Sequence, residues 1–378
     1  MQQPKHSVPK ILSIVWYKVL PARYGGQKGI AHFNQHLAGH YPLVCLCSSN
    51  NEPADFLSYQ LKPVLPTGKW QFINPAVWWT ILSEAKKIEA THVIIEHPYH
   101  AIAGYLCKIF LRTKLLIHSH NIEHTRFKEQ QKWWWYLLQY FEQWAHTKAD
   151  LSLFKTQADL NYAVNNFKLD ESKCMVVPYG VEKATPKILK EKAKQILASK
   201  HAEIRNKKIA FFAGTLDYLP NAKAVENIFK NVAPALTANE YAIVICGRNK
   251  LPEFQYLKDL KHKAIVYAGE VEDLEIYYAA ADVFINPLAA SSGVQTKTMD
   301  ALQHGLNVVC FAGNIEGVPM QLVQAKMFIA TDNDWGDFVL KIITAVKFTS
   351  ATPSLFFEQL SWQSITRNVA QKLDELED

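Results

Sequence analysis

A histidine-rich loop follows one of the apolar segments of the chain, and its residue types could perform acid–base or metal chemistry. The stretch from His118 to His124 reads HSHNIEH, so three imidazoles and the Glu123 carboxylate lie close together. Such groups bind transition metals or exchange protons near neutral pH. The HxHxxxH spacing does not match the helical HExxH pattern of zinc enzymes. A metal site and purely structural histidines remain alternatives, but we predict that His120 contacts a substrate.

A second segment, residues 287–309, combines a loop of small residues with a helix that carries two charges near its start. Ser292 and Gly293 end the loop, and Lys297 and Asp300 follow three residues apart, on one helical face. A cation beside unpaired N–H groups suits a diphosphate, and a carboxylate one turn further suits ribose hydroxyl groups. The alternative is an exposed ion pair worth roughly tenths of a kcal/mol. We favour ligand binding.

Glycine turns follow several other apolar segments. Gly25 and Gly26 come between the first predicted strand and a helix, where backbone N–H groups could approach an anion, although a plain tight turn is an equal alternative. In the second half, Gly214, Gly247 and Gly269 each follow a strand-like run. Three such turns in one domain predict a phosphate and nucleotide rim along one sheet edge.

Apolar runs rich in β-branched residues alternate with amphipathic stretches along the whole chain, which predicts an α/β fold. Strands this apolar fit a parallel sheet that is covered on both faces. The predicted strands are Lys10–Trp16, Leu43–Cys47, His92–Glu96, Lys114–His118, Asp150–Phe154, Met175–Pro178, Ile209–Ala213, Ala242–Cys246, Ile265–Tyr267, Val283–Asn286 and Asn307–Cys310.

The alternation pauses once, which divides the chain into two predicted domains. Residues 183–200 are polar and rich in lysine, so we expect a linker there, between a domain of residues 1–182 and a domain of residues 183–354. A terminal amphipathic helix over about 355–378 is expected to pack back on the first domain. Ligands of two such domains bind at the carboxyl ends of the strands.

Composition excludes several classes of protein. The 378 residues are 49% hydrophobic and 20% charged, which is typical of a globular chain and not of a disordered or fibrous one. The six cysteines lack metal-ligand spacing and are expected to be free buried thiols. Neither a signal peptide nor a membrane-spanning run is visible, so we expect a cytoplasmic protein.

The net charge of +6 lies within residues 1–182 and could meet an anionic surface or substrate, whereas no motif indicates nucleic-acid binding. A Trp-rich stretch, residues 133–144, raises the possibility of peripheral contact with the inner face of a membrane. Helical spacing favours the plainer interpretation, in which a stripe packs on the core; that stripe is Trp134, Leu137, Leu138, Phe141 and Trp144.

These motifs together resemble the retaining glycosyltransferases of family 4, over nearly the whole chain. The most specific match is the loop, helix and strand from Gly293 to Val309. Further matches are Gly25–Gly26, the loop His120–Glu123, the turn Pro178–Val181, Gly214, the strand and turn Ala281–Leu288, and the start of the last helix at Leu360–Trp362.

The resemblance implies the GT-B architecture, with two facing Rossmann-like doubly wound parallel-sheet domains and a C-terminal crossover helix. It implies a hexosyltransferase of polysaccharide biosynthesis that uses a nucleotide-diphosphate-sugar donor and a glycan or lipid-linked acceptor, with no metal and no other cofactor. It assigns catalytic roles to His120 and Lys297. The implied donor-binding residues are Gly26, Gly214, Thr215, Gly247, Arg248, Glu270, Val271, Ser292, Gly293, Val294, Gln295, Thr296, Lys297 and Asp300.

Some family features are missing. The usual glutamate of the donor helix is Asp300, the earlier glutamate of the family's pair falls at Ser292, and a common basic pair appears as Thr215 and Pro220. The chain could therefore be a catalytically silent homologue that binds nucleotide-sugar as a partner subunit. A nucleotide-sugar epimerase of the same architecture is a further alternative, against which the donor helix argues.

Overall fold

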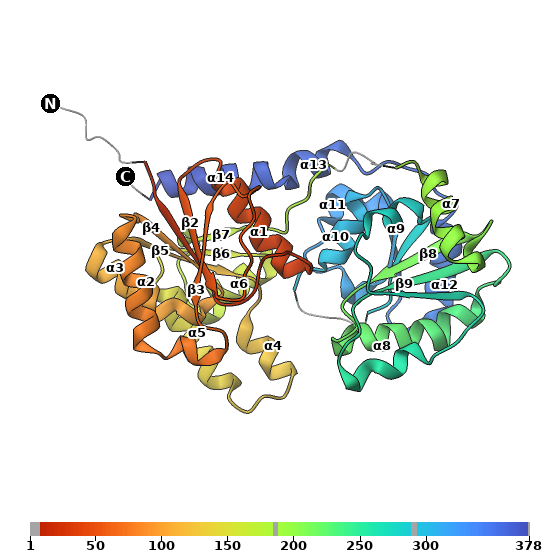
Figure 1. The fold of residues 1–378 in the computed structure, drawn as a ribbon, viewed down its shortest axis with the longest axis horizontal. Coiled ribbons are helices and arrows are strands. Elements are labelled where there is room, and N and C mark those ends of the chain that lie inside the picture. The colour runs from red at the N-terminus through yellow and green to blue at the C-terminus, as the bar shows by residue number, and fades with distance from the viewer. Residues whose placement is uncertain (1–7, 184–187, 289–292, 377–378) are drawn as a thin grey trace. The chain divides into compact units, whose positions relative to one another are not determined.

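The computed structural model describes residues 8–183, 188–288 and 293–376. The chain forms two compact units, the first of residues 1–180 with 359–378 and the second of residues 181–358. Each unit is a parallel sheet between layers of helices (Figure 1). The fold class is therefore the predicted α/β class with two doubly wound parallel sheets.

The first sheet has the strand order β3-β2-β1-β4-β5-β6-β7. Its strands are β1 (Ile11–Val15), β2 (Leu43–Ser48), β3 (Gln60–Leu65), β4 (His92–Glu96), β5 (Lys114–Ser119), β6 (Leu151–Phe154) and β7 (Cys174–Val176). Its helices are α1 (Gly25–Leu37), α2 (Pro75–Lys87), α3 (Ala101–Leu111), α4 (Glu123–Glu129), α5 (Trp135–Lys148), α6 (Gln157–Tyr162) and α14 (Trp362–Asp374).

The second sheet has the order β10-β9-β8-β11-β12-β13. Its strands are β8 (Lys208–Ala213), β9 (Tyr241–Cys246), β10 (Ile265–Gly269), β11 (Val283–Asn286), β12 (Val308–Phe311) and β13 (Met327–Ala330). The helices that follow in this part of the chain are α7 (Lys190–Lys200), α8 (Leu219–Asn227), α9 (Glu275–Ala280), α10 (Thr296–Gln303), α11 (Met320–Val323), α12 (Trp335–Ala345) and α13 (Ser354–Leu360).

The strand order reverses beside the first strand of each sheet. In the first unit β1 pairs with both β2 and β4, and in the second unit β8 pairs with both β9 and β11. At such a point the loops after adjacent strands lead to helices on opposite faces, which opens a crevice at the carboxyl edge. The loops after β1, β4, β8 and β11 therefore border the binding crevices of their units.

All predicted strands are present, with small shifts at their ends, and two further strands, β3 and β13, were not predicted. Residues 183–200 were expected to form a linker, but residues 190–200 are the helix α7. Lys190 and Lys194 of α7 both pair with Asp282, the residue before β11, at 2.8 Å. These ion pairs fix α7 to the second unit and explain why a lysine-rich stretch is ordered.

The C-terminal segment was expected to be one helix and is two. Ser361 ends α13 and caps α14, because its hydroxyl accepts a hydrogen bond from Ser364 N. Trp362 then fixes α14 to the first unit: its ring stacks on His32 of α1 and contacts Tyr179 edge-on. No room is left at Gly180, where an added Cβ would lie 2.3 Å from the indole.

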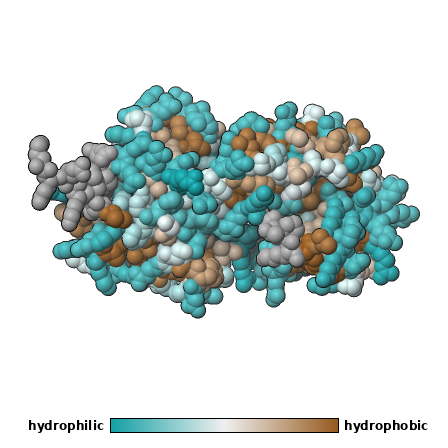
Figure 2. Space-filling view, turned by 90° about the horizontal axis from the view of Figure 1, so that it is seen from above, coloured by the Kyte–Doolittle hydropathy of each residue, from teal (hydrophilic) through white to brown (hydrophobic). Residues whose placement is uncertain are grey.

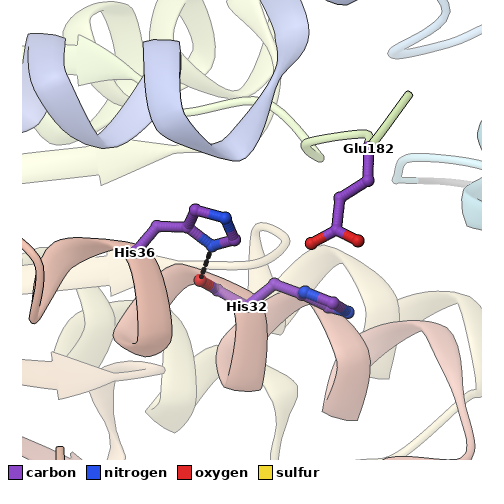
Figure 3. A group of neighbouring side chains, drawn as sticks. All are labelled: His32, His36 and Glu182. Carbon is purple, nitrogen blue, oxygen red and sulfur yellow. Dashed lines mark hydrogen bonds between the residues drawn. The ribbon is translucent and has the colours of Figure 1, made fainter. Parts of the chain in front are cut away.

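Helix α1 has one buried face and one partly exposed face. Ile30, Phe33 and Leu37 are fully buried, as their spacing predicts. Figure 3 shows the exposed side, where His32 and His36 project from successive turns and His36 Nδ1 hydrogen-bonds the His32 carbonyl oxygen at 2.8 Å. The tautomer with the proton on Nδ1 is the one that this bond requires.

The aromatic helix α5 packs less completely than predicted. Of the predicted stripe, Leu138 is buried, and Trp134, Phe141 and Trp144 are partly buried, but Leu137 is 53% exposed. Trp133, which lies outside the predicted stripe, is 74% exposed. Glu142 and His146 occupy buried positions of the helix instead. The prediction was therefore wrong for Leu137, because polar side chains with buried partners take part of the inward face.

The cysteines are the free thiols that the sequence predicts, and one face of the molecule is mostly polar (Figure 2). All six cysteines are free thiols, and all but Cys174 are buried. The face drawn in Figure 2 is mostly hydrophilic, with small separate hydrophobic patches. Within residues 8–183, 188–288 and 293–376, every helix is too short or too polar to cross a membrane.

Gly247 offers a test of the packing at the edge of the second sheet. An added Cβ would lie 1.9 Å from Gly214 O, a backbone atom, so Gly247→Ala must displace the turn after β8. We expect a loss of about 1–3 kcal/mol in the free energy of unfolding, measured by urea denaturation.

Gly336→Ala is the matched control in the same unit. Its Cβ would lie 3.3 Å from Asp334 Oδ1, a side-chain atom that can move, and alanine favours the helix. If both variants are equally stable, the close approach at Gly247 is not a constraint.

Candidate functional site

The crevice of the first unit is lined by a buried hydrogen-bond network around Glu96, the last residue of β4. The register pairs Glu96 with His118 on β5, and side chains of paired residues share a face of the sheet. The Glu96 carboxylate accepts from His118 Nδ1 at 3.0 Å and from His120 Nε2 at 2.6 Å. Phe33 of α1 covers this face, 4.6 Å from the His118 ring.

The protonation states in this network follow from burial and from the donors. Burial would raise the pKa of Glu96, but the two histidine donors hold it well below its usual range, so the carboxylate is ionised. Burial lowers the pKa of His120 well below its ordinary value, and the nearby His97 and Lys155 add to this effect. A neutral His120 that donates from Nε2 carries its lone pair on Nδ1.

A second carboxylate, Glu123, joins the loops after β4 and β5. It accepts from His97 Nδ1 at 2.9 Å and from Tyr99 at 2.8 Å, and it pairs with Arg126 at 2.5 Å. Burial opposes ionisation, but these partners lower the pKa of Glu123 to about 2. His97 also stacks on His120, with ring centroids 4.5 Å apart. Glu123 therefore orients His97, which in turn limits the movement of His120.

A third carboxylate, Glu142 of α5, fixes the end of the loop that carries His120. Glu142 of α5 accepts from the backbone N–H groups of Glu123 and His124, at 2.8 and 3.1 Å, and from His124 Nδ1 at 2.7 Å. These are the first N–H groups of α4, which lack partners within the helix. Glu142 thus caps α4 and sets the end of the loop.

The start of α1 borders the same crevice. Gln27 Oε1 accepts from the N–H groups of Arg23 and Tyr24, so the loop before the helix is closed by its own first turn. An added Cβ at Gly26 would lie 3.7 Å from the Tyr17 hydroxyl, an ordinary contact. The predicted role of Gly26 in donor binding therefore does not follow from packing within this unit and stays a prediction.

The Glu96, His118 and His120 ligand atoms lie within 4.8 Å of one another, close enough to hold a metal ion. Both histidine nitrogens, however, face the carboxylate as hydrogen-bond donors. A metal would have to displace those two protons. The hydrogen bonds alone account for this arrangement.

In the second unit, the three predicted glycine turns are joined edge to edge. Gly214 N donates to Cys246 O at 3.1 Å, and Gly247 N donates to Gly269 O at 2.7 Å. Gly269 has φ +70°, which favours glycine. The turns after β8, β9 and β10 thus form one continuous rim, to which Glu270 and Val271 belong.

Lys297 lies against this rim. It is partly buried in the first turn of α10, and its Nζ donates to Asn221 Oδ1 at 2.5 Å and lies 5.2 Å from the centre of the Phe212 ring. Asn221 Nδ2 in turn donates to Thr215 O at 2.8 Å. Burial lowers the pKa of Lys297 to about 7. A binding anion would restore the charge of this lysine.

The neighbouring predicted residues are placed as follows. Gly293 has φ +85°, and Val294, Gln295 and Thr296 lead into α10, with Gln295 as the residue before the helix. Asp300 lies one turn after Lys297, and its charge helps to raise the pKa of the buried Tyr278 above its ordinary value, after the larger effect of burial. The prediction for Ser292 falls outside the described residues.

Two predicted donor-binding residues have protein partners. Arg248 Nε donates to Asp217 at 2.8 Å, while Asp217 also accepts from the N–H groups of Lys250 and Leu251. Glu270 pairs with Lys250 at 2.8 Å. Arg248 therefore braces the turn after β9, and any contact with a ligand stays a prediction.

Sequence reasoning missed several members of both networks. Glu96 stands at the carboxyl end of a predicted strand, and that position is a signal that could have identified it. Arg126 lies three residues after Glu123, a helical spacing that could have identified their ion pair. The roles of Tyr99, Lys155 and Asn221 depend on contacts between segments farther apart in the sequence, for which the sequence holds no signal.

Comparisons with known proteins agree with this organisation. The family model described as Glycosyltransferase Family 4 matches residues 25–184, and the one described as Glycosyl transferases group 1 matches residues 207–347. No curated protein matches the chain in sequence.

Several solved structures are similar to this chain over nearly their whole length. A glycosyltransferase from Rickettsia africae is 17% identical with a TM-score of 0.74, covering 98% of this chain and 99% of the other. Sucrose-phosphate synthase from Thermosynechococcus elongatus is 13% identical with a TM-score of 0.76, covering 97% and 99%. HepE from Anabaena, crystallised with UDP and glucose, is 14% identical with a TM-score of 0.73, covering 97% and 100%.

At these identities the solved structures establish the fold alone, which is the GT-B class. The two family matches cover most of the residues of both units. The chain belongs to the group 1 glycosyltransferases of family 4.

Proposed function

We propose that this glycosyltransferase moves a hexosyl group from a nucleoside-diphosphate sugar to a glycan or lipid-linked acceptor, with retention of anomeric configuration. The observation that carries the donor assignment is the rim of three glycine turns with Lys297 set against it through Asn221. Backbone N–H groups and one cation are what a diphosphate requires. Retention is the outcome that the resemblance to family 4 implies.

The proposed roles follow from the chemistry of the departing group. When the glycosidic bond to the donor breaks, negative charge grows on the diphosphate, and Lys297 with the start of α10 stabilises that charge. Asp300 accepts hydrogen bonds from ribose hydroxyl groups. In the first unit, the lone pair of His120 Nδ1 accepts a hydrogen bond from a hydroxyl of the transferred sugar. The scheme needs no metal ion.

A silent nucleotide-sugar-binding homologue is the second candidate. Arg248 is engaged by Asp217, which leaves Lys297 as the cation proposed for the diphosphate. Release of UDP from UDP-hexoses in the presence of candidate acceptors separates the two: the silent homologue would bind UDP and release none from the donor.

Lys297 should make UDP binding depend on pH. Its pKa of about 7 means that the ammonium form declines as the pH rises above that value, and only the ammonium attracts the diphosphate. We expect UDP affinity to fall about tenfold from pH 6 to about pH 9, measured by titration calorimetry. Lys297→Ala should weaken binding at the lower pH and lower turnover further.

Two variants control this result. Lys297→Arg keeps its charge throughout and should bind UDP with little dependence on pH. Asp300→Asn should weaken binding by roughly 1–3 kcal/mol at every pH, because it removes one acceptor charge. Wild-type affinity in all three variants would contradict the assignment of this face of α10 to the donor.

His120 should affect turnover more than donor affinity. His120→Ala removes an acceptor for the transferred sugar, so we expect turnover to fall about 10- to 100-fold while UDP affinity stays nearly unchanged. His40→Ala, an exposed histidine after the end of α1, is the control and should behave as wild type. Unchanged turnover of His120→Ala, or loss of wild-type activity with a chelator, would contradict the assignment.

We also propose that the acceptor side of the first unit rests on an anionic membrane surface. Exposed apolar side chains follow β3 and lie at the start of α5, and exposed lysines accompany them. The aromatic surface consists of Trp70, Ile73, Trp133, Tyr136, Leu137 and Tyr140, with Lys69, Lys128 and Lys132. Lys69 Nζ lies 5.9 Å from the Trp134 ring, which brings the two parts together. Aromatic rings with lysines suit a bilayer interface.

Vesicle binding tests this surface. The protein should float with phosphatidylglycerol vesicles at low salt and much less with phosphatidylcholine vesicles. The double variant Trp133→Ala/Tyr140→Ala should bind about tenfold more weakly. Phe348→Ala, which removes an exposed ring of the second unit, should bind as wild type. Absence of flotation at low salt would overturn the proposal.

A further inference from the structure

Among the residues that the structure describes, two lysines are nearly fully buried, and they differ in their partners. Lys155 is 5% exposed and Lys326 is 1% exposed, and burial lowers the pKa of each to about 8. Lys326 Nζ donates to the carbonyl oxygens of Gly305 and Ser350, at 2.8 and 2.5 Å. Lys155 Nζ is buried with no hydrogen-bond partner among the described residues.

This difference separates a structural lysine from one that the fold does not need. A buried ammonium without hydrogen bonds costs free energy, because it has lost its hydration and gained no partner. Lys326 recovers that cost by joining two chain segments. Lys155 makes no such hydrogen bond, so any favourable interaction of its charge must come from the charged groups around it.

Lys155 lies beside the Glu96 network. It directly follows β6, whose last residue, Phe154, pairs with Ser119 of β5. The next step along both strands brings Lys155 beside His120. Because side chains alternate along a strand, both lie on the face that carries Glu96 and His118.

Lys155 is a positive charge close to the buried Glu96 carboxylate. His118 and His120 hydrogen-bond Glu96, and burial lowers the pKa of each ring below its ordinary value, which disfavours a full charge on either ring near neutral pH. Arg126 is engaged by Glu123, and other titratable groups near the network are His97, the Tyr17 hydroxyl and the buried Cys45 thiol. The field of Glu96 raises the pKa of Lys155 against the larger effect of burial, so each ion stabilises the other.

We propose that Lys155 is a positioning residue that adds its charge to the two histidine hydrogen bonds in keeping Glu96 ionised, and thereby helps to hold His120 in the tautomer with its lone pair on Nδ1. With Glu96 ionised, His120 must donate from Nε2. If Glu96 instead takes up a proton, its O–H donates to Nε2 and the ring proton moves to Nδ1. His120 would then offer the crevice a donor in place of an acceptor. The consequence for sugar transfer rests on the proposed function, whereas the tautomer does not.

Nitrogen-15 NMR of the histidine rings tests the proposal without any sugar nucleotide or acceptor. Wild type should show His120 protonated on Nε2 near neutral pH, with the resonance assigned by its loss in His120→Gln. In Lys155→Met, the Glu96–His120 pair should take up its proton at a pH about one unit higher, and the ring should shift toward Nδ1–H. Lys155→Arg, which keeps the charge, should restore the wild-type titration.

Thermal unfolding separates this role from a structural one. Lys155→Met should change the melting temperature less than Lys326→Met does, because Lys155 makes no hydrogen bond and the variant loses only its attraction to Glu96. Lys326→Met, the matched control, should lower the melting temperature, because it leaves two carbonyl oxygens without their donor. If Lys155→Met does not fold, Lys155→Gln is the neutral variant for NMR.

A His120 ring that titrates in folded Lys155→Met or Lys155→Gln as it does in wild type would overturn the proposal. A shifted titration that Lys155→Arg does not restore would also contradict it, since the charge would not be the cause. Neither result depends on whether the protein transfers sugar, so failure here is distinct from failure of the proposed function.

Discussion

The reversal of strand order beside β1 and β8 is the constraint on which both sites depend. All strands of a sheet run the same way, so their carboxyl ends share one edge, and the reversal sends the helices of adjacent loops to opposite faces. In the first unit this places Glu96 at the edge next to the start of α1. In the second unit it places the Gly214 turn beside the strand that leads to Gly293. Polar side chains can lie at these two positions on the carboxyl edges because the adjacent loops diverge there.

In the first unit, three buried carboxylates fix the polar side chains at this edge through hydrogen bonds. Glu96, Glu123 and Glu142 are almost completely enclosed, and each accepts hydrogen bonds from at least two groups. A buried carboxylate with fewer donors would take up a proton or destabilise the fold. Their donors come from β5, α4 and the loops after β4 and β5, so the three side chains join segments that the sheet only brings near. The orientation of His120 results from the hydrogen bonds that these three carboxylates accept.

Sequence alone predicted the elements better than the contacts between them. The apolar runs identified the central strands because burial on both faces requires them. β3 escaped because it is an edge strand with Lys62 and Pro63, and a partly exposed strand has no such run. His120 was found because its loop is conspicuous. Glu96 was not: its position at the end of a predicted strand was a signal, but its partner His118 is set by the register between β4 and β5. Pairing between strands is a property of the folded chain.

The chain from Thr215 through Asn221 to Lys297 bears on the family features that this sequence lacks. Thr215 stands where the family often has a basic residue, yet its carbonyl oxygen accepts from Asn221, and Asn221 accepts from Lys297. The cation is thereby brought from α10 to the turn after β8, although the turn has none of its own. Burial lowers the pKa of this lysine to about 7, so it carries only part of its charge near neutral pH until an anion binds. A single lysine held in this way gives its full charge only when the ligand provides the partner, and the electrostatic attraction then acts in a site that is already shaped to receive it.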